Sequence, residues 1–160
     1  MAEKTDENEL KKEYQPLQKK FNLPSFDSLE NDFGMMDEET DKYVLSKIRR
    51  KMSDKIDFYI SVLGNIFEGD ATLSNIYESK VFDEESKTEL FKIYKRLMRY
   101  GRDANILSLT YDERAEAEYI KEFYKEWQHL KEGIKKQLVL FRDIWDSETN
   151  TNEDILNYLG

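Results

Sequence analysis

Three long stretches of this sequence repeat their hydrophobic residues at intervals of three and four positions. In the last of them, Ile120, Phe123, Trp127, Leu130 and Ile134 follow one another at gaps of 3, 4, 3 and 4. This spacing places apolar side chains on one face of an α-helix and is typical of helices that pack in bundles or coiled coils. The period-two alternation that indicates strands is absent from the sequence. The pattern therefore predicts an all-α fold.

The same spacing sets the expected bounds of three long helices, at residues 37–68, 83–108 and 110–146. Short connections between consecutive helices favour antiparallel neighbours, so we expect an antiparallel, up-down-up three-helix bundle of long helices. We expect Asp83 to cap the second helix, and Thr110 with Glu113 to form a capping box at the start of the third.

One domain is expected to cover residues 1–160, because a chain of this length fits a single domain. Outside the bundle we expect a frayed start at 1–9, a short helical wrap at 10–36 and a short helical tail at 152–160. The wrap contains four spaced aromatic residues, Tyr14, Phe21, Phe26 and Phe33. We expect them to fasten the wrap to the bundle; the alternative is a recognition segment for another protein's groove.

The third long helix is expected to extend past the connection between the first two, because it is the longest. Its last turns carry Leu138, Phe141, Ile144 and Trp145, which need an apolar cover. We expect that cover from the connector residues Leu73, Ile76, Tyr77, Val81 and Phe82. A partner chain, including a homodimer formed through this end, is the alternative.

Each long helix has a stripe of apolar residues that faces the other helices, which we call its seam, and several seam positions carry specific expectations. Trp127 and Ile134 are predicted to lie in the central core, and Gln137 is the one polar residue of the seam. Gly101 and Ala104 share the stripe of the second long helix, where small residues indicate close helix approach.

Composition excludes several kinds of site. The chain has no cysteine and one histidine, which rules out disulfide scaffolds, thiolate zinc sites, iron–sulfur ligation and a cysteine nucleophile. His129 stands three residues after Glu126, but a diiron bundle needs this E-x-x-H motif twice, and the seam predicts that His129 points outward. The sequence therefore predicts no catalytic, cofactor-binding or metal residue, and no enzyme.

The compartment is predicted from what the sequence lacks. No apolar run approaches the length of a membrane span, and the first residues do not resemble a signal peptide. We expect a cytoplasmic protein without a membrane partner.

The charge of the chain is segregated along its length. The formal net charge is −9, yet residues 42–55 and residues 92–102 each carry a net charge of +5. An acidic protein is disfavoured as a general nucleic-acid binder, because phosphate binding needs a cationic surface.

The two basic blocks suggest a candidate anionic-partner patch. Antiparallel pairing of the first two long helices would bring Arg49, Arg50, Arg99 and Arg102 together, and arginine forks suit phosphate or carboxylate. We favour instead an internal charge network, in which these arginines pair with the acidic start of the third helix, including Glu113 and Glu116.

The function classes follow from these features. We expect a non-enzymatic intracellular protein-protein interaction or adaptor module, whose partner is another protein. The alternative is a nucleic-acid-associated accessory factor that uses the arginine cluster; an enzyme with a carboxylate site is a third class. A candidate docking tail is formed by the apolar residues after the polar break, Ile155, Leu156, Tyr158 and Leu159.

Overall fold

The computed structural model describes residues 3–35, 42–67, 72–79 and 82–146. Within these ranges the chain forms six α-helices and no strand. They are α1 (Glu3–Phe21), α2 (Phe26–Phe33), α3 (Val44–Gly64), α4 (Leu73–Ser79), α5 (Glu84–Leu107) and α6 (Glu113–Asp146). The prediction of an all-α fold is confirmed.

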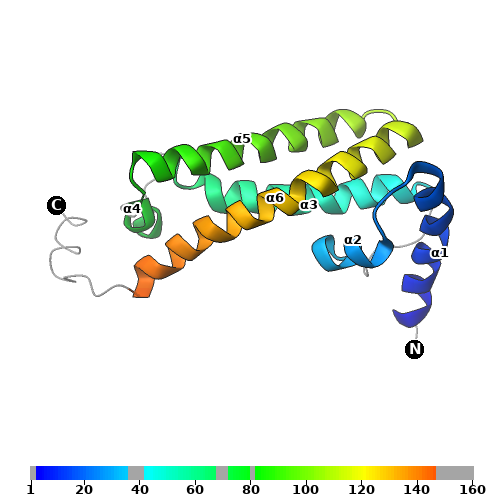
Figure 1. The fold of residues 1–160 in the computed structure, drawn as a ribbon, viewed down its shortest axis with the longest axis horizontal. Helices are drawn as coiled ribbons and strands as arrows, with labels where there is room; N and C mark the ends of the chain where they lie inside the picture. Colours follow the sequence, from blue (N-terminus) through cyan, green and yellow to red (C-terminus); the bar gives the residue numbers. More distant parts are fainter. Residues whose placement is uncertain (1–2, 36–41, 68–71, 80–81, 147–160) are drawn as a thin grey trace.

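The three long helices α3, α5 and α6 pack against one another and form the bundle. Figure 1 shows α3 and α6 running in the same direction and α5, along the upper edge of the view, running in the opposite one. This is the up-down-up arrangement that the short connections predict. The axis of α6 is inclined to those of α3 and α5, so its C-terminal end stands apart from them (Figure 1).

The N-terminal wrap consists of α1, which lies across one end of the bundle, and the short helix α2 (Figure 1). Helix α1 begins at Glu3, earlier than the start at residue 10 that the sequence predicts, and it continues through Pro16. It ends where Asn22 adopts a left-handed backbone conformation with φ of 55°. Asparagine tolerates this conformation and is a common residue just after a helix. Ser25 then caps α2 by accepting a hydrogen bond from the Ser28 amide.

The aromatic residues of the wrap fasten it to the bundle, as expected. Tyr14, Phe26 and Phe33 are buried. The Tyr14 hydroxyl donates to the Pro24 carbonyl at 2.6 Å, which ties α1 to the segment before α2. The ring of Phe33 lies 5.6 Å from that of Trp127, centroid to centroid, and joins α2 to α6.

The long helices differ from their predicted bounds by more than one residue at three ends, which are both ends of α3 and the start of α6. Helix α3 starts at Val44 and ends at Gly64, within the predicted range 37–68. Residues 37–41 and residue 68 of that range lie outside the described residues. Asp83 caps α5 through the Ser86 amide, as predicted. The capping box of Thr110 with Glu113 is wrong, because the carboxylate of Asp112 accepts the Ala115 amide at 3.0 Å and begins α6 two residues later.

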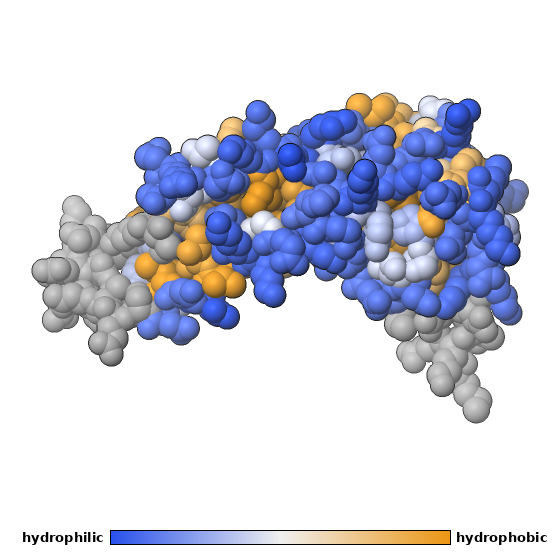
Figure 2. All heavy atoms as spheres, in the orientation of Figure 1, coloured by the Kyte–Doolittle hydropathy of each residue, from blue (hydrophilic) through white to orange (hydrophobic). Residues whose placement is uncertain are grey.

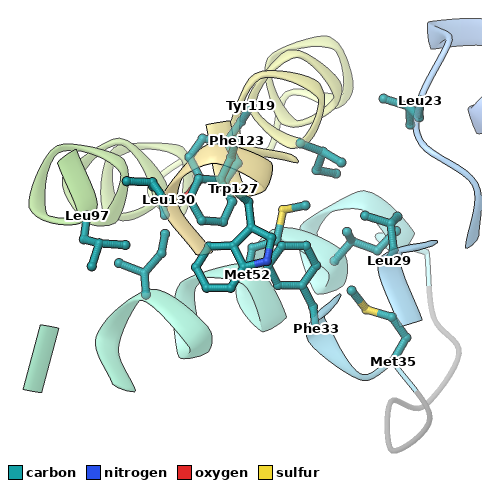
Figure 3. Packing of buried hydrophobic residues seen from close by; sticks show 14 of the residues in the cluster. Leu23, Leu29, Phe33, Met35, Met52, Leu97, Tyr119, Phe123, Trp127 and Leu130 are labelled. Carbon is teal, nitrogen blue, oxygen red and sulfur yellow. The ribbon is translucent and has the colours of Figure 1, made fainter. Parts of the chain in front are cut away.

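The core is a continuous apolar cluster to which α3, α5 and α6 contribute the seam residues and α1 and α2 a further layer. Trp127 and Ile134 are 4% and 3% exposed, so both lie in the core as predicted. Figure 3 shows Trp127 beside Phe33 of α2 and Met52 of α3. Gln137 is also buried, and its Oε1 accepts no hydrogen bond from the residues that the structure describes.

Glycines allow the helices to approach closely. A Cβ added at Gly101 would lie 3.4 Å from Cγ2 of Ile56, so the predicted close approach of α5 to α3 is confirmed. Gly64 and Gly133 make tighter approaches that the sequence pattern did not indicate. A Cβ there would lie 3.0 Å from the Tyr94 ring and 2.9 Å from Cδ1 of Ile93.

The connector between α3 and α5 covers part of the overhanging end of α6, as predicted for Tyr77 and Phe82. Of the other expected residues, Leu73 is 63% exposed, and Val81 lies outside the described residues. The Tyr77 ring lies 4.8 Å from that of Trp145, and the buried Phe82 ring lies 4.9 Å from that of Phe141. Trp145 donates its indole N–H to Glu78 Oε1 at 3.0 Å. The chain itself therefore provides the apolar contacts for which a partner chain was the alternative.

Across the described ranges, none of the helices combines the length and apolar character needed to cross a membrane.

Candidate functional site

A groove of about 350 Å³ runs along α6 beside the C-terminal half of α3. We call it the α6 groove. Tyr59 of α3 forms one wall, and the other lining residues come from α6: Trp127, Lys131, Ile134, Lys135, Leu138, Val139 and Arg142. The helical period explains why they share one face, because they recur at three- and four-residue intervals beside the buried stripe.

The α6 groove combines an apolar floor with a cationic rim. Trp127 and Ile134 are buried at its base, while Leu138 and Val139 are half-buried. Every charged residue that lines it is basic: Lys131, Lys135 and Arg142. Such a surface suits a ligand with an apolar face and negative charge beside it.

The protein's own helix α2 already occupies the adjoining part of this face. Phe33 packs on Trp127, and the Asp32 carboxylate accepts hydrogen bonds from Gln128 at 3.0 Å and from Lys131 at 3.3 Å. Helix α2 carries Asp27, Glu30 and Asp32 and no basic residue. An aromatic ring on the floor and a carboxylate on the rim are thus the contacts by which an acidic helix binds here.

Figure 2 shows hydrophobic side chains gathered over the C-terminal part of α6, on a face that is otherwise largely hydrophilic. The half-buried Leu138, Val139 and Leu140 belong to this part of the helix, and all three leave some apolar surface in contact with solvent. A contiguous apolar patch that polar residues surround is typical of an interaction surface.

The four arginines of the predicted patch do not share one environment. Arg49 is 8% exposed and donates from Nε to Glu116 Oε2 at 2.7 Å. Its other nitrogens donate to the Ala104 carbonyl and to Ser46 Oγ. Arg49 is therefore committed to an internal contact between α3, α5 and α6.

The other three arginines are exposed. Arg50 lines a pocket together with Arg49, whereas neither Arg99 nor Arg102 belongs to its wall. Arg99 lies 3.7 Å from Asp103 on its own helix and stacks on the Tyr100 ring. The expected pairing of Arg99 and Arg102 with Glu113 and Glu116 is wrong, since Glu113 binds Lys20 at 2.7 Å and Glu116 binds Arg49.

Interhelical ion pairs nevertheless join basic and acidic helices as the sequence suggested. Arg96 of α5 lies 2.6 Å from Glu126 of α6, in addition to the Arg49–Glu116 pair. Glu116 is 0% exposed, and burial, the largest effect, raises the pKa of its carboxyl although the Arg49 guanidinium opposes the change. Glu116 stands four residues before Ile120, in phase with the apolar stripe of α6, and this spacing is the sequence signal that could have indicated its burial.

The other residues that the sequence singled out are His129, as a possible metal ligand, and the candidate docking tail. His129 is exposed, as its place outside the apolar stripe of α6 predicted. Among the described residues, no group of three or more His, Asp and Glu side chains is placed to hold a metal ion. The candidate docking tail, Ile155, Leu156, Tyr158 and Leu159, lies outside the described residues.

Comparison of the chain with protein-family models, with curated proteins and with solved structures gives no significant match.

Proposed function

We propose that this protein is a non-enzymatic interaction module that binds an acidic amphipathic helix of a partner protein in the α6 groove. The observation that carries the proposal is the composition of that groove, an apolar floor bordered by basic side chains alone. Helix-in-groove recognition needs an apolar trough for the i, i+3 and i+4 residues of the ligand.

Helix α2 supports the proposal as an internal example of the ligand. It presents Phe33 to the floor and Asp32 to the rim of the same surface. Beyond the end of α2, Lys135 and Arg142 repeat the basic rim, and Leu138 continues the floor. A partner helix that follows α2 along α6 would bury apolar surface and place its acids against these two cations.

The partner is sought by capture from a lysate of the native cells with the full-length protein immobilised. The variant Val139→Glu puts a carboxylate into the groove, whereas Ile106→Glu makes the same kind of change at an exposed aliphatic residue of α5. We expect at least one protein to be retained by the wild type and by Ile106→Glu but not by Val139→Glu. Identical sets of retained proteins would refute the groove as the binding surface.

The contribution of the basic rim to partner binding is tested with two neighbouring lysines. Lys135 lines the groove, whereas Lys136 is exposed and does not line it. Lys135→Glu should weaken binding of the captured partner about tenfold or more, and Lys136→Glu should change it little. If a synthetic peptide of residues 147–160 displaces the captured partner at low concentration, the chain's own tail competes with the partner helix for the same groove.

A further inference from the structure

The chain itself contains a segment with the composition that the α6 groove suits. Residues 147–160 follow α6 directly in the sequence and lie outside the described residues. They carry the three acids Glu148, Glu153 and Asp154 and no lysine or arginine. The charged residues that line the groove are all basic, so the two surfaces are electrostatically complementary.

The candidate docking tail also has the apolar spacing that helix-in-groove binding needs. Ile155, Tyr158 and Leu159 stand at positions i, i+3 and i+4, which share one face when the segment is helical. Glu153 and Asp154 come immediately before them, where acids stabilise the start of a helix. Residues 152–160 are therefore an acidic amphipathic segment, the kind of ligand that the α6 groove suits.

This segment is long enough to reach the groove from the end of α6. Helix α6 ends at Asp146, and Val139 of the groove lies about 10 Å back along the same helix at 1.5 Å per residue. The polar residues 147–152 span up to roughly 20 Å when extended. The apolar residues that follow them can therefore turn back and lie on Leu138 and Val139.

The end of the groove nearest to residue 147 is open to such an occupant. Helix α2 takes up the other end, where Phe33 packs on Trp127 and Asp32 binds Lys131. At the near end Leu138 and Val139 are half-buried, and Arg142 is exposed. Arg142 contacts Asp143, its neighbour in the sequence, at 3.0 Å. Exposed pairs of this kind contribute little, so exchanging Asp143 for another carboxylate costs little.

We propose that residues 152–160 occupy this end of the α6 groove in the free protein. Their apolar face lies on Leu138 and Val139, and their acids lie against Lys135 and Arg142. A partner helix then has to displace a segment of the same chain before it binds. Occupancy by this segment stands on the groove and the sequence alone, whereas its competition with a partner rests on the proposed function.

Occupancy is tested in the full-length chain with a nitroxide spin label on the variant Asn157→Cys. The chain has no other cysteine, so the label attaches at this position alone. We expect the amide NMR signals of Leu138 and Val139 to lose most of their intensity, because a nearby nitroxide broadens them. The signal of Ile106 should keep its intensity, since this residue lies in the last turn of α5, beside the start of α6 and far from Asp146.

Two further variants of the labelled chain serve as a matched pair. Ile155→Glu with Leu159→Glu puts two carboxylates on the apolar face and should restore the signals of the groove. Thr149→Glu with Thr151→Glu adds the same charge to the polar stretch and should leave them weakened. Full intensity at Leu138 and Val139 without these changes overturns the proposal.

A second sample distinguishes the chain's own segment from that of another copy. It mixes the spin-labelled chain with an isotope-enriched chain that carries no label, so only contacts between molecules weaken the signals. Full intensity of Leu138 and Val139 in this mixture supports occupancy within one molecule. Weakened signals in the mixture assign the groove to a second copy and overturn it.

Competition is measured with the partner captured from the lysate. Ile155→Glu with Leu159→Glu should bind it about threefold or more tightly than the wild type does, because a groove that is filled in about two thirds of the molecules is open to the partner only in the rest. Unchanged affinity overturns the competition.

The two proposals fail in different ways. Weakened groove signals together with identical capture by Val139→Glu refute the partner site and support occupancy by residues 152–160. Full groove signals together with loss of the partner from Val139→Glu refute that occupancy and support the partner site.

Discussion

Arg49 Nε lies 2.7 Å from Glu116 Oε2, and this ion pair is buried where α3 meets the start of α6. The guanidinium also donates to the Ala104 carbonyl of α5, so one side chain joins all three long helices. Glu116 Oε1 has no hydrogen-bond partner among the described residues. A buried pair that is satisfied on one side only is costly to desolvate, and it is more costly still to break.

Removing one partner of this pair should be strongly destabilising. Glu116→Ala leaves the Arg49 cation buried without its carboxylate, and we expect a loss of about 3–5 kcal/mol in the free energy of unfolding. Arg49→Met combined with Glu116→Leu removes both charges and should recover most of that loss. Urea unfolding of the single and double variants measures the coupling directly. In the control Glu118→Ala, at an exposed position of the same turn, the change should stay within about 0.5 kcal/mol.

Because the pKa of Glu116 is raised, its contribution to the free energy of unfolding depends on pH. Burial, its largest cause, makes the folded protein hold the proton more tightly than the unfolded chain does. The contribution of this group to stability is therefore present below its unfolded pKa and is lost as the pH rises through the raised folded pKa. Relative to Glu116→Gln, which cannot titrate, the wild type should lose stability from about pH 4 upward.

The comparison with Glu116→Gln is needed because other acids oppose this trend. A hydrogen bond from the Ser86 amide lowers the pKa of Asp83, and Lys92 lowers that of Glu89, so both groups make the protein more stable as the pH rises. These contributions are common to both proteins and cancel in the difference. A difference that is flat with pH, or that rises, would show that Arg49 outweighs the burial of Glu116.

The two tryptophans of α6 differ in burial and offer a matched test of the core. Trp127 is 4% exposed, whereas Trp145 is 54% exposed and packs on Tyr77. Trp127→Ala should cost about 3–5 kcal/mol, as the loss of a large buried aromatic residue does. Trp145→Ala should cost about 1 kcal/mol or less, because most of its ring remains in water. Similar losses of stability in the thermal unfolding of the two variants would contradict the assignment of Trp127 to the buried face of α6.

The sequence predicts the parts of this fold that depend on repeated apolar spacing. The three long helices and the burial of Trp127 follow from the periods of three and four residues. The helix directions follow from the short connections, and the cover over Phe141 follows from the greater length of the third helix. The start of α6 does not follow, because Thr110 and Asp112 are both good caps and only the folded geometry selects Asp112.

The candidate sites were less predictable than the fold. The α6 groove draws its walls from Tyr59 and from residues spread over about four turns of α6, so it depends on how α3 and α6 are inclined. The arginine patch failed as a unit for a related reason. Antiparallel pairing of α3 and α5 predicts that Arg49 and Arg99 lie at the same level of the bundle. It does not predict which way each side chain points: Arg49 points into the bundle, whereas Arg99 is exposed.

Two substitutions at Gly101, one expected to raise stability and one to lower it, test how closely α5 approaches α3. Its missing Cβ would lie 3.4 Å from Ile56, which is an ordinary van der Waals contact. Gly101→Ala should therefore raise the free energy of unfolding by about 0.5–1 kcal/mol, the gain in helix propensity. Gly101→Leu should instead lower it by about 1–3 kcal/mol, because the larger side chain would force α5 away from α3. Equal stability of the two variants in urea unfolding would show that the helices are farther apart at this level.

The exposed arginines of α5 distinguish an internal charge network from a free basic surface. Arg99 has Asp103 on its own helix as its carboxylate neighbour, at 3.7 Å, and the acids first expected to pair with α5 are bound by Lys20 and Arg49. Exposed ion pairs contribute little, so reversing Arg99 and Arg102 to glutamate should change stability by about 1 kcal/mol or less. Adding Glu113→Lys should give no rescue, because it breaks the contact with Lys20 instead.

The control is an ion pair that does join α5 to α6, Arg96 with Glu126. Here Arg96→Glu should be partly rescued by Glu126→Arg in a double-mutant cycle. A rescue of the Arg99 and Arg102 reversal by Glu113→Lys would restore the network first inferred from charge alone.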